Sequence, residues 1–161
     1  PQAAVEDIVV TRNIIRDVGN AFLIFGQDDL AGGGPVGVAR RFKIRDNLIE
    51  RNDLSRSQPA FANIFFDLNL GVDDVEITHN TAWSSDPAGF LLNLRGLNLL
   101  MDNLRFENNL ARFGQGIVSQ TGQIGGAALT AVAPGAVFNR NALEGGAPAG
   151  LPPGNFFPAD S

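Results

Sequence analysis

The chain has 161 residues, a net charge of −5, no Cys and a single His. This length fits one domain with a buried core, and an acidic balance without any run of basic residues disfavours nucleic-acid binding. No apolar stretch approaches the roughly 18 residues of a membrane span, and the lack of Cys excludes disulfides and thiolate metal sites.

Five segments align without gaps as imperfect repeats, each with an alternating apolar stretch, two polar residues, an Asn and a second alternating stretch. They are residues 8–17, 42–51, 75–84, 104–113 and 136–145. The aligned asparagines, at separations of 34, 33, 29 and 32 residues, are Asn13, Asn47, Asn80, Asn109 and Asn141. A fixed period of about 33 residues predicts a solenoid in which each repeat stacks on the next.

The stretches on either side of each Asn alternate apolar and polar residues, which is typical of strands with one buried face. Before the Asn, the side chains expected to point inward are Ile8, Val10, Phe42, Ile44, Val75, Ile77, Leu104, Phe106, Ala136 and Phe138. After it, they are Ile15, Ile49, Ala82, Ala111 and Leu143. A third strand is predicted at 21–25, 61–66, 89–94 and 116–120, with only 155–157 in the comparable place of the last repeat.

Three stacked strands per repeat predict an all-β fold, a right-handed single-stranded parallel β-helix of about five coils in one domain, 1–161. The expected coils are 5–37, 38–71, 72–98, 99–135 and 136–161. At the corner between the first two strands we expect the Asn to adopt the left-handed conformation and its amide to join an Asn ladder. An antiparallel sandwich is the alternative, but it lacks a fixed period. No segment shows a helical period with caps.

The stretches VTRNII (10–15), ITHNTA (77–82) and FENNLA (106–111) resemble the repeats of pectate-lyase-like right-handed β-helix proteins. The closing stretch 134–161 is similar to uncharacterised bacterial β-helix proteins that are exported. The resemblance implies an extracellular or periplasmic location, although the chain opens without a Met or a signal peptide. It also implies that this chain is part of a longer solenoid. Because the superfamily contains lyases, hydrolases, esterases and adhesins, the resemblance implies no single activity.

Polysaccharide-active β-helices work along one sheet and its flanking loops, which here follow the third strand of each repeat and vary most in length. Acidic residues in these loops are candidates for binding Ca²⁺ as a cofactor: Asp28, Asp29, Asp67, Asp73 and Asp74. Asp67 with Asp73 or Asp74 is also a candidate carboxyl pair for glycoside hydrolysis, near one end of one sheet. Arg40, Arg41 and Arg95 are candidates for pairing with a uronate. The alternative is solvated turn residues and surface salt bridges.

Three further features stand at the corners of the repeats. His79 precedes Asn80 and is expected to be a polar surface residue. Trp83 falls in a charged column and is expected to be exposed, where it packs at an edge or stacks on a sugar or a partner. Ile14, Leu48 and Leu110 would form an exposed apolar stripe if they face outward.

Two functions follow as hypotheses. The first is an extracellular carbohydrate-associated β-helix that binds or helps to process a polysaccharide, with no catalytic motif visible. The second is a structural solenoid that stacks end to end, on partner subunits or on remaining coils of the same protein, because a solenoid without caps exposes open sheet edges. We expect no catalysis from this chain alone; a polysaccharide lyase or glycoside hydrolase is the enzymatic alternative.

Overall fold

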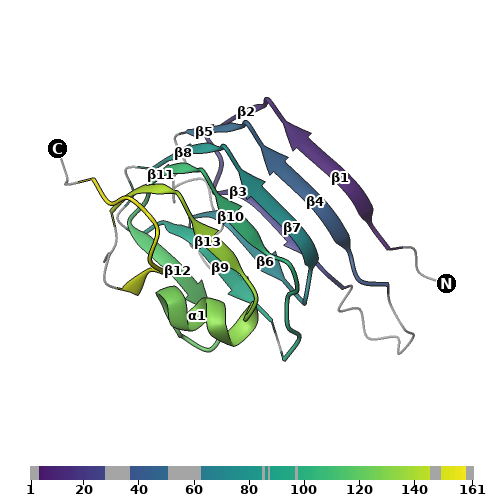
Figure 1. Ribbon diagram of the computed structural model, residues 1–161. Coiled ribbons are helices and arrows are strands. Elements are labelled where there is room, and N and C mark those ends of the chain that lie inside the picture. The colour runs from purple at the N-terminus through teal and green to yellow at the C-terminus, as the bar shows by residue number, and fades with distance from the viewer. Residues whose placement is uncertain are drawn as a thin grey trace.

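The computed structural model describes residues 4–27, 37–50, 63–84, 86, 88–96, 98–145 and 150–158. Over these ranges the chain is mostly β, with fourteen strands and one short helix, α1 (Gly125–Val132). The strands form three sheets, and each sheet is a ladder of parallel pairs (Figure 1). This is the arrangement of an all-β parallel solenoid, as the repeats predict.

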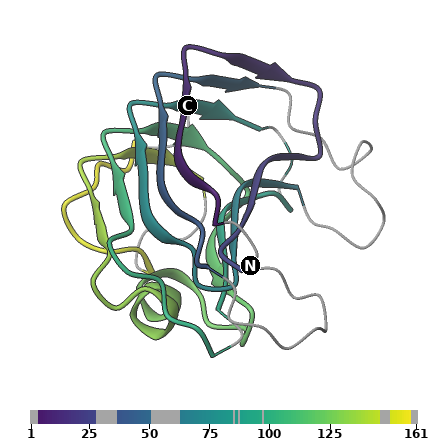
Figure 2. The same cartoon turned by 90° about the vertical axis from the view of Figure 1, so that its right-hand side faces the viewer.

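Each sheet collects the equivalent strands of successive repeats. Sheet A, in the order β1-β4-β7-β10-β13, contains β1 (Glu6–Thr11), β4 (Arg40–Arg45), β7 (Asp73–Thr78), β10 (Arg105–Glu107) and β13 (Val137–Asn139). Sheet B, in the order β14-β11-β8-β5-β2, contains β2 (Ile14–Arg16), β5 (Leu48–Glu50), β8 (Thr81–Trp83), β11 (Leu110–Arg112) and β14 (Ala142–Glu144). Sheet C, in the order β12-β9-β6-β3, contains β3 (Asn20–Phe25), β6 (Ile64–Asn69), β9 (Phe90–Arg95) and β12 (Gln115–Ser119). Figure 2 shows the repeats stacked one behind another.

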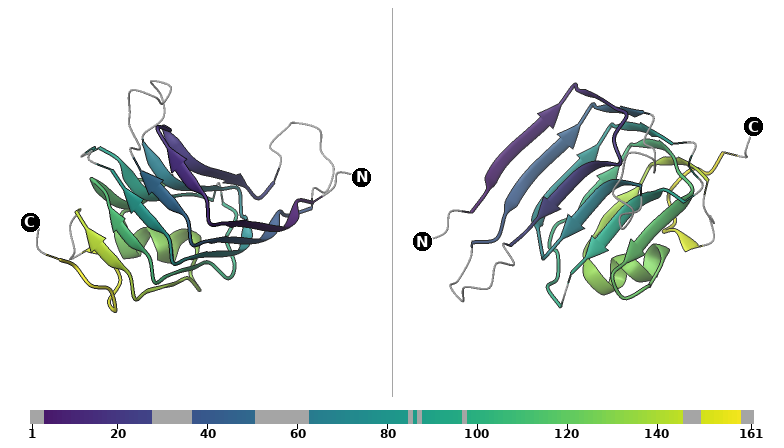
Figure 3. Two further views of the ribbon diagram at one scale, coloured as in Figure 1. Left: turned by 90° about the horizontal axis from the view of Figure 1, so that it is seen from above. Right: turned by 180° about the vertical axis from the view of Figure 1, so that it is seen from behind.

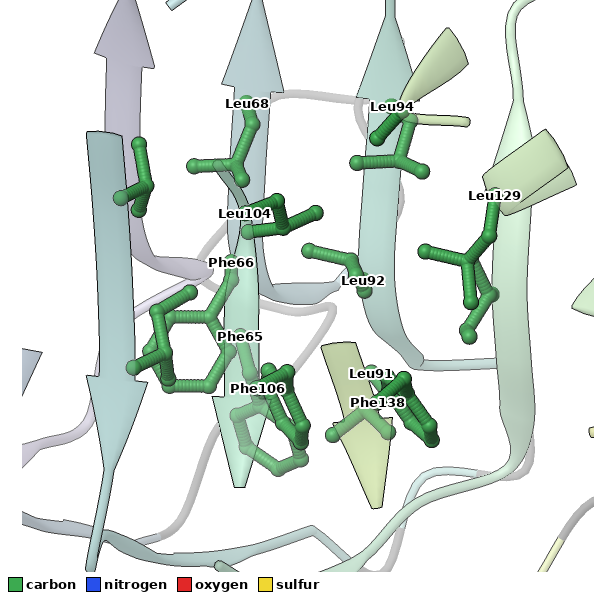
Figure 4. Close-up of a cluster of buried hydrophobic side chains, with 14 of the residues drawn as sticks. Phe65, Phe66, Leu68, Leu91, Leu92, Leu94, Leu104, Phe106, Leu129 and Phe138 are labelled. Carbon is green, nitrogen blue, oxygen red and sulfur yellow. The ribbon is translucent and has the colours of Figure 1, made fainter. Parts of the chain in front are cut away.

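The core consists of the side chains that the alternation places inward. Ile44, Ile77 and Phe106 of sheet A and Ile49 of sheet B are buried, whereas Lys43 between its inward neighbours is exposed. Phenylalanine rings contact one another in the core, both between successive strands of one sheet and, for Phe66 and Phe106, between sheets C and A (Figure 4). Their centroids are 5.5 Å apart for Phe22–Phe66, 5.7 Å for Phe66–Phe106 and 4.9 Å for Phe106–Phe138. Burial of each ring contributes about 1.5–3 kcal/mol.

Two local predictions were wrong. The third strand of the second repeat was expected at 61–66, but the observed strand, β6, spans Ile64–Asn69. Asp67 therefore belongs to a strand and not to a loop. The period of two is hidden there because both faces of β6 are buried, and Phe65 and Phe66 are adjacent. Helix α1 lies in a segment expected to be a loop; it has no side-chain cap and is held by packing of Ala128, Leu129 and Val132 against the core.

At the corner of each repeat, the residue in the left-handed conformation is not the one that was predicted. The residue before the Asn, and not the Asn itself, has a positive φ of 55–58°. These residues are Arg12, Asp46, His79, Asn108 and Arg140. The left-handed residue turns the chain, which leaves the following Asn free to point its amide along the axis between repeats.

The Asn ladder itself is confirmed, and it is directional. The backbone N–H and the Nδ2 of Asn80 both donate to Oδ1 of Asn109, at 2.9 and 3.1 Å. Asn80 Nδ2 also donates to the carbonyl of Ile44 in the preceding repeat, at 2.9 Å. The same two donations to the next amide oxygen recur at Asn13, Asn47 and Asn109. The interior ladder amides, Asn47, Asn80 and Asn109, therefore satisfy buried polar groups in both neighbouring repeats.

The ladder continues one step beyond the last aligned repeat. Asn141 donates its backbone N–H and Nδ2 to Oδ1 of Asn155, at 3.0 and 2.8 Å, and Phe156 forms a parallel bridge with Ala142. Residues 155–157 thus correspond to an Asn corner and not, as predicted, to a third strand. The prediction failed because Asn155 follows Asn141 by 14 residues and not by a full repeat.

We expect Asn80→Ala to lower the free energy of unfolding by about 2–4 kcal/mol, because it strands buried donors of Asn47 and the carbonyl of Ile44. Asn13→Ala is the matched control at the exposed end of the ladder and should lower it by about 1 kcal/mol or less. Urea unfolding followed by circular dichroism measures both. Equal losses for the two variants would contradict a ladder that stabilises through buried amides.

Candidate functional site

A polar network occupies the outward side of sheet C, between strands whose inward side chains fill the core. Asp67 and Asn93 are register partners on β6 and β9, as are Asn69 and Arg95. Oδ1 of Asp67 accepts hydrogen bonds from Nδ2 of Asn69 and of Asn93, each at 3.0 Å. Its Oδ2 lies 3.6 Å from a guanidinium nitrogen of Arg95. Three side chains from two adjacent strands, those of Asn69, Asn93 and Arg95, therefore converge on the Asp67 carboxyl group.

The electrostatics of this network are dominated by burial. Asp67 is only 1% exposed, and burial raises the pKa of its carboxyl above the usual value, while Arg95 and the two amides oppose that rise. The side chain of Arg95 is 34% exposed, so its positive charge reaches the surface. Beside the network, the register continues onto β3 with Leu23 and Phe25, whose side chains are exposed. Because Asp67, Asn69 and Asn93 are buried, the groups that a ligand can reach beside this network are the Arg95 guanidinium and the side chains of Leu23 and Phe25.

The predicted carboxyl pair is divided between two sheets. Asp67 lies within β6 of sheet C, whereas Asp73 and Asp74 begin β7 of sheet A, so the expectation that they share one sheet was wrong. Asp73 Oδ1 accepts the backbone N–H of Asp102 at 3.0 Å, and Asp74 Oδ1 accepts Nδ2 of Asn103 at 2.7 Å. Within the described residues, no three His, Asp or Glu side chains gather as a metal site. Asp28 and Asp29 lie outside those residues.

Arg40 and Arg41 form surface ion pairs with the preceding repeat. The Nε of Arg40 lies 2.8 Å from Glu6, and Arg41 pairs with both Glu6 and Asp7. Hydrogen bonds from Arg41 hold the pKa values of the Glu6 and Asp7 carboxyls below their usual values. These two arginines therefore already have carboxylate partners, as the salt-bridge alternative expects.

The outward face of sheet B carries the apolar stripe. Ile14 is 61% and Leu110 52% exposed, and Leu48 is half-buried in the same register column. Trp83 is exposed in the neighbouring column between Glu50 and Arg112, as predicted. His79 is exposed at its corner, also as predicted.

The two ends of the stack differ, and Figure 3 shows them on opposite sides of the molecule. At the N-terminal end, β1, β2 and β3 are the outermost strands of sheets A, B and C. The inward-facing Ile8 is 37% exposed there, and Ile15, Phe22 and Ile24 are only partly buried. No N–H among the described residues donates to Oδ1 of Asn13, the first amide of the ladder. The N-terminal end therefore presents the Oδ1 acceptor of Asn13, surrounded by an apolar rim that consists of these partly exposed side chains.

The C-terminal end is covered by the chain's own segments. Residues 150–158, here called the tail, supply Asn155 and Phe156 to sheet B and the ladder. Leu151 and Phe157 of the tail pack against the core. On sheet C, Ile124 bridges Val118 of β12 just before helix α1. Sequence reasoning missed Asn69, Asn93 and Asn155, although the polar Asn93 inside an apolar run was a usable signal.

The chain matches no protein-family model, no curated protein and no solved structure. The resemblance to pectate-lyase-like proteins therefore stays a prediction. Within the described residues, no helix combines the length and the apolar character that crossing a membrane requires.

We expect Asp67→Asn to raise the melting temperature at neutral pH and to leave it nearly unchanged in strong acid. The pKa of Asp67 is raised in the folded state. The contribution of this carboxyl to the free energy of unfolding is therefore greatest at pH values below the usual Asp pKa, and it is lost as the pH rises through the raised pKa. The amide keeps an oxygen for Asn69 and Asn93. Thermal unfolding between pH 3 and pH 8 measures the difference.

The control is Asp102→Asn, because Asp102 is exposed. Its melting curve should follow the wild-type pH profile. A constant offset between Asp67→Asn and wild type at every pH would contradict the assigned role of burial.

Proposed function

We propose that this chain is a segment of a right-handed parallel β-helix of about five coils that serves as an assembly scaffold, docking a further parallel β-coil on its N-terminal end. Parallel strands joined by crossovers are right-handed in nearly all known cases, which supports the handedness. The observation that carries the function is the difference between the ends: on sheet B the tail bridges β14 and continues the ladder, whereas β1, β2 and β3 have free edges among the described strands.

Physical chemistry favours a protein partner at that end. A row of unpaired backbone N–H and C=O groups is a template for another strand, and a solenoid repeat gains stability from each neighbour. The partly exposed Ile15, Phe22 and Ile24 would be buried by a stacked coil. A soluble ligand could cover the apolar rim but not satisfy the edges of three strands at once.

We expect the full chain to associate between low micromolar and millimolar concentration, and Ile14→Lys to suppress this association. A Lys on an edge strand disfavours further pairing, and the exposure of Ile14 leaves room for it in the monomer. The matched control is Leu110→Lys, in the same column of sheet B but on the interior strand β11. Sedimentation velocity measures all three proteins; a strictly monomeric wild type would contradict the proposal.

A second candidate function is carbohydrate binding outside the cytoplasm through the outward face of sheet C. It is favoured by one observation, the partly exposed Arg95 beside the exposed Leu23 and Phe25. Guanidinium groups pair with carboxylates in two-point fashion, so an acidic polysaccharide is the expected ligand. As only Asp67 among the described strand residues of sheet C carries a carboxylate, binding is favoured over hydrolysis.

If this second function holds, Arg95→Ala should abolish retention on acidic polysaccharides in affinity electrophoresis, while Arg112→Ala on sheet B should not. The panel includes neutral glycans and runs with and without Ca²⁺, and the same tubes are assayed for new reducing ends and unsaturated uronates. Released products would establish a lyase or a hydrolase. Retention without products would leave a binding protein, and no retention on any glycan would exclude this function.

A further inference from the structure

We propose that the tail is an internal cap that occupies the ladder position which the N-terminal end of a second copy of this chain would take. Displacement of the tail would then let copies stack head to tail. This inference rests on the proposed assembly function and names the partner. It follows from three features: the direction of the ladder, the register of the tail and the charges of the facing columns.

The ladder direction makes the two ends complementary. Each Asn gives its backbone N–H and Nδ2 to the Oδ1 of the next, so the last repeat ends with two donors, those of Asn141. The first repeat begins with an acceptor, Oδ1 of Asn13. Two N-terminal ends would bring acceptor against acceptor, whereas one N-terminal and one C-terminal end join donors to an acceptor.

The tail imitates the start of a repeat. Asn155 Nδ2 donates to the carbonyl of Phe138 at 3.2 Å, as Asn141 Nδ2 does to Phe106 one repeat earlier, at 3.0 Å. The backbone N–H of Phe156 donates to the carbonyl of Asn141 at 2.8 Å, as Leu48 does to Asn13 at 2.9 Å. Asn13 and Ile14 of a second copy would make the same bonds. The tail and the N-terminal end of a second copy therefore compete for the same backbone and amide groups.

The columns of the two ends also match in charge. In sheet B, Arg112 pairs with Glu144, and Arg16 pairs with Glu50. Placing Arg16 of a second copy after Glu144 continues this alternation of sign. In sheet A, the exposed Val137 would lie beside the exposed Val9 of the second copy. In sheet B, Ala142 would lie beside Ile14 of the second copy. One pair opposes the stack, since Arg140 would follow Arg12, but both lie at solvent-exposed corners where repulsion is weak.

A second copy would make a more extensive edge than the tail does. The tail offers one bridge, Ala142–Phe156, and the side chain of Phe156 remains 66% exposed. The second copy would bring β1 and β2, continuing sheets A and B. Sheet C would not continue, because Ile124 already bridges β12. Intramolecular attachment gives the tail its advantage at low concentration, and that advantage fails as the concentration of copies rises.

The decisive experiment locks the tail in place. Ala142 and Phe156 are bridge partners on adjacent parallel strands, about 4.8 Å apart, which a disulfide spans. The chain has no other Cys, so Ala142→Cys/Phe156→Cys forms a single defined bond. We expect the oxidised protein to remain monomeric at concentrations where wild type associates, and reduction to restore association. Association of the oxidised protein at wild-type strength would overturn the proposal.

Loosening the tail should have the opposite effect. Asn155→Ala/Phe157→Ser removes the ladder amide of the tail and the ring that packs against the core, and we expect the association constant of this variant to rise roughly tenfold. Phe157→Ser alone is the milder variant should the double variant unfold, and Gln120→Ala, at an exposed position outside the tail, should behave as wild type. A folded tail variant that associates no more strongly than wild type would count against the cap.

Direction is tested by mixing two single-Cys chains, Arg16→Cys and Glu144→Cys, under mild oxidation. Head-to-tail stacking gives disulfides between the two kinds of chain, because the two positions become strand neighbours. Disulfides that join two Arg16→Cys molecules to each other would show head-to-head pairing and overturn the proposal.

If wild type and every variant are monomers at all concentrations, the assembly function itself fails. Association that is indifferent to the tail refutes the cap alone.

Discussion

The interaction on which the rest of the structure depends is the ladder of asparagine amides. A buried primary amide is tolerated only when its donors and acceptor are satisfied, and here each interior amide, such as that of Asn80, is satisfied by the repeats on both sides of it. That requirement fixes the register of successive repeats, because a shift of one residue would strand several buried groups and move the core side chains outward. The apolar core supplies most of the stability, but the ladder decides which stacking is allowed.

The corner illustrates how local strain and long-range pairing are combined. A left-handed residue with a side chain is unfavourable by itself, and the chain places Arg12, His79 and Arg140 in that conformation without using Gly. The conformation persists because the following Asn donates twice to the next ladder amide and, in the repeats after the first, accepts two hydrogen bonds from the preceding one. Strain at one residue is thus offset by hydrogen bonds of its neighbour, repeated once per turn of the solenoid.

The sequence was sufficient to predict the strands that have one face buried and the other face exposed to solvent. Sheets A and B follow the alternation closely, since residues such as Lys43 and Ile44 differ sharply in exposure. Sheet C was less predictable because β6 is buried on both faces, which erases the period of two. The network around Asp67 depends on which residue of β9 lies beside it, and no local pattern encodes that register. Asn155 was missed because its spacing, unlike its chemistry, departs from the repeat.

A stack of similar repeats has no intrinsic length, so its ends determine whether it stops or grows. Stopping requires something that satisfies the last ladder donors without offering a new template of its own. The tail meets the first condition through Asn155 and, because Phe156 adds a single bridge and no full strand, also the second. Among the described residues, β1 and β2 have no strand beside their outer edges, and Oδ1 of Asn13 accepts no hydrogen bond. Under the proposed assembly, a further coil pairs with these N-terminal strands directly, and with the C-terminal strands only after the tail is displaced.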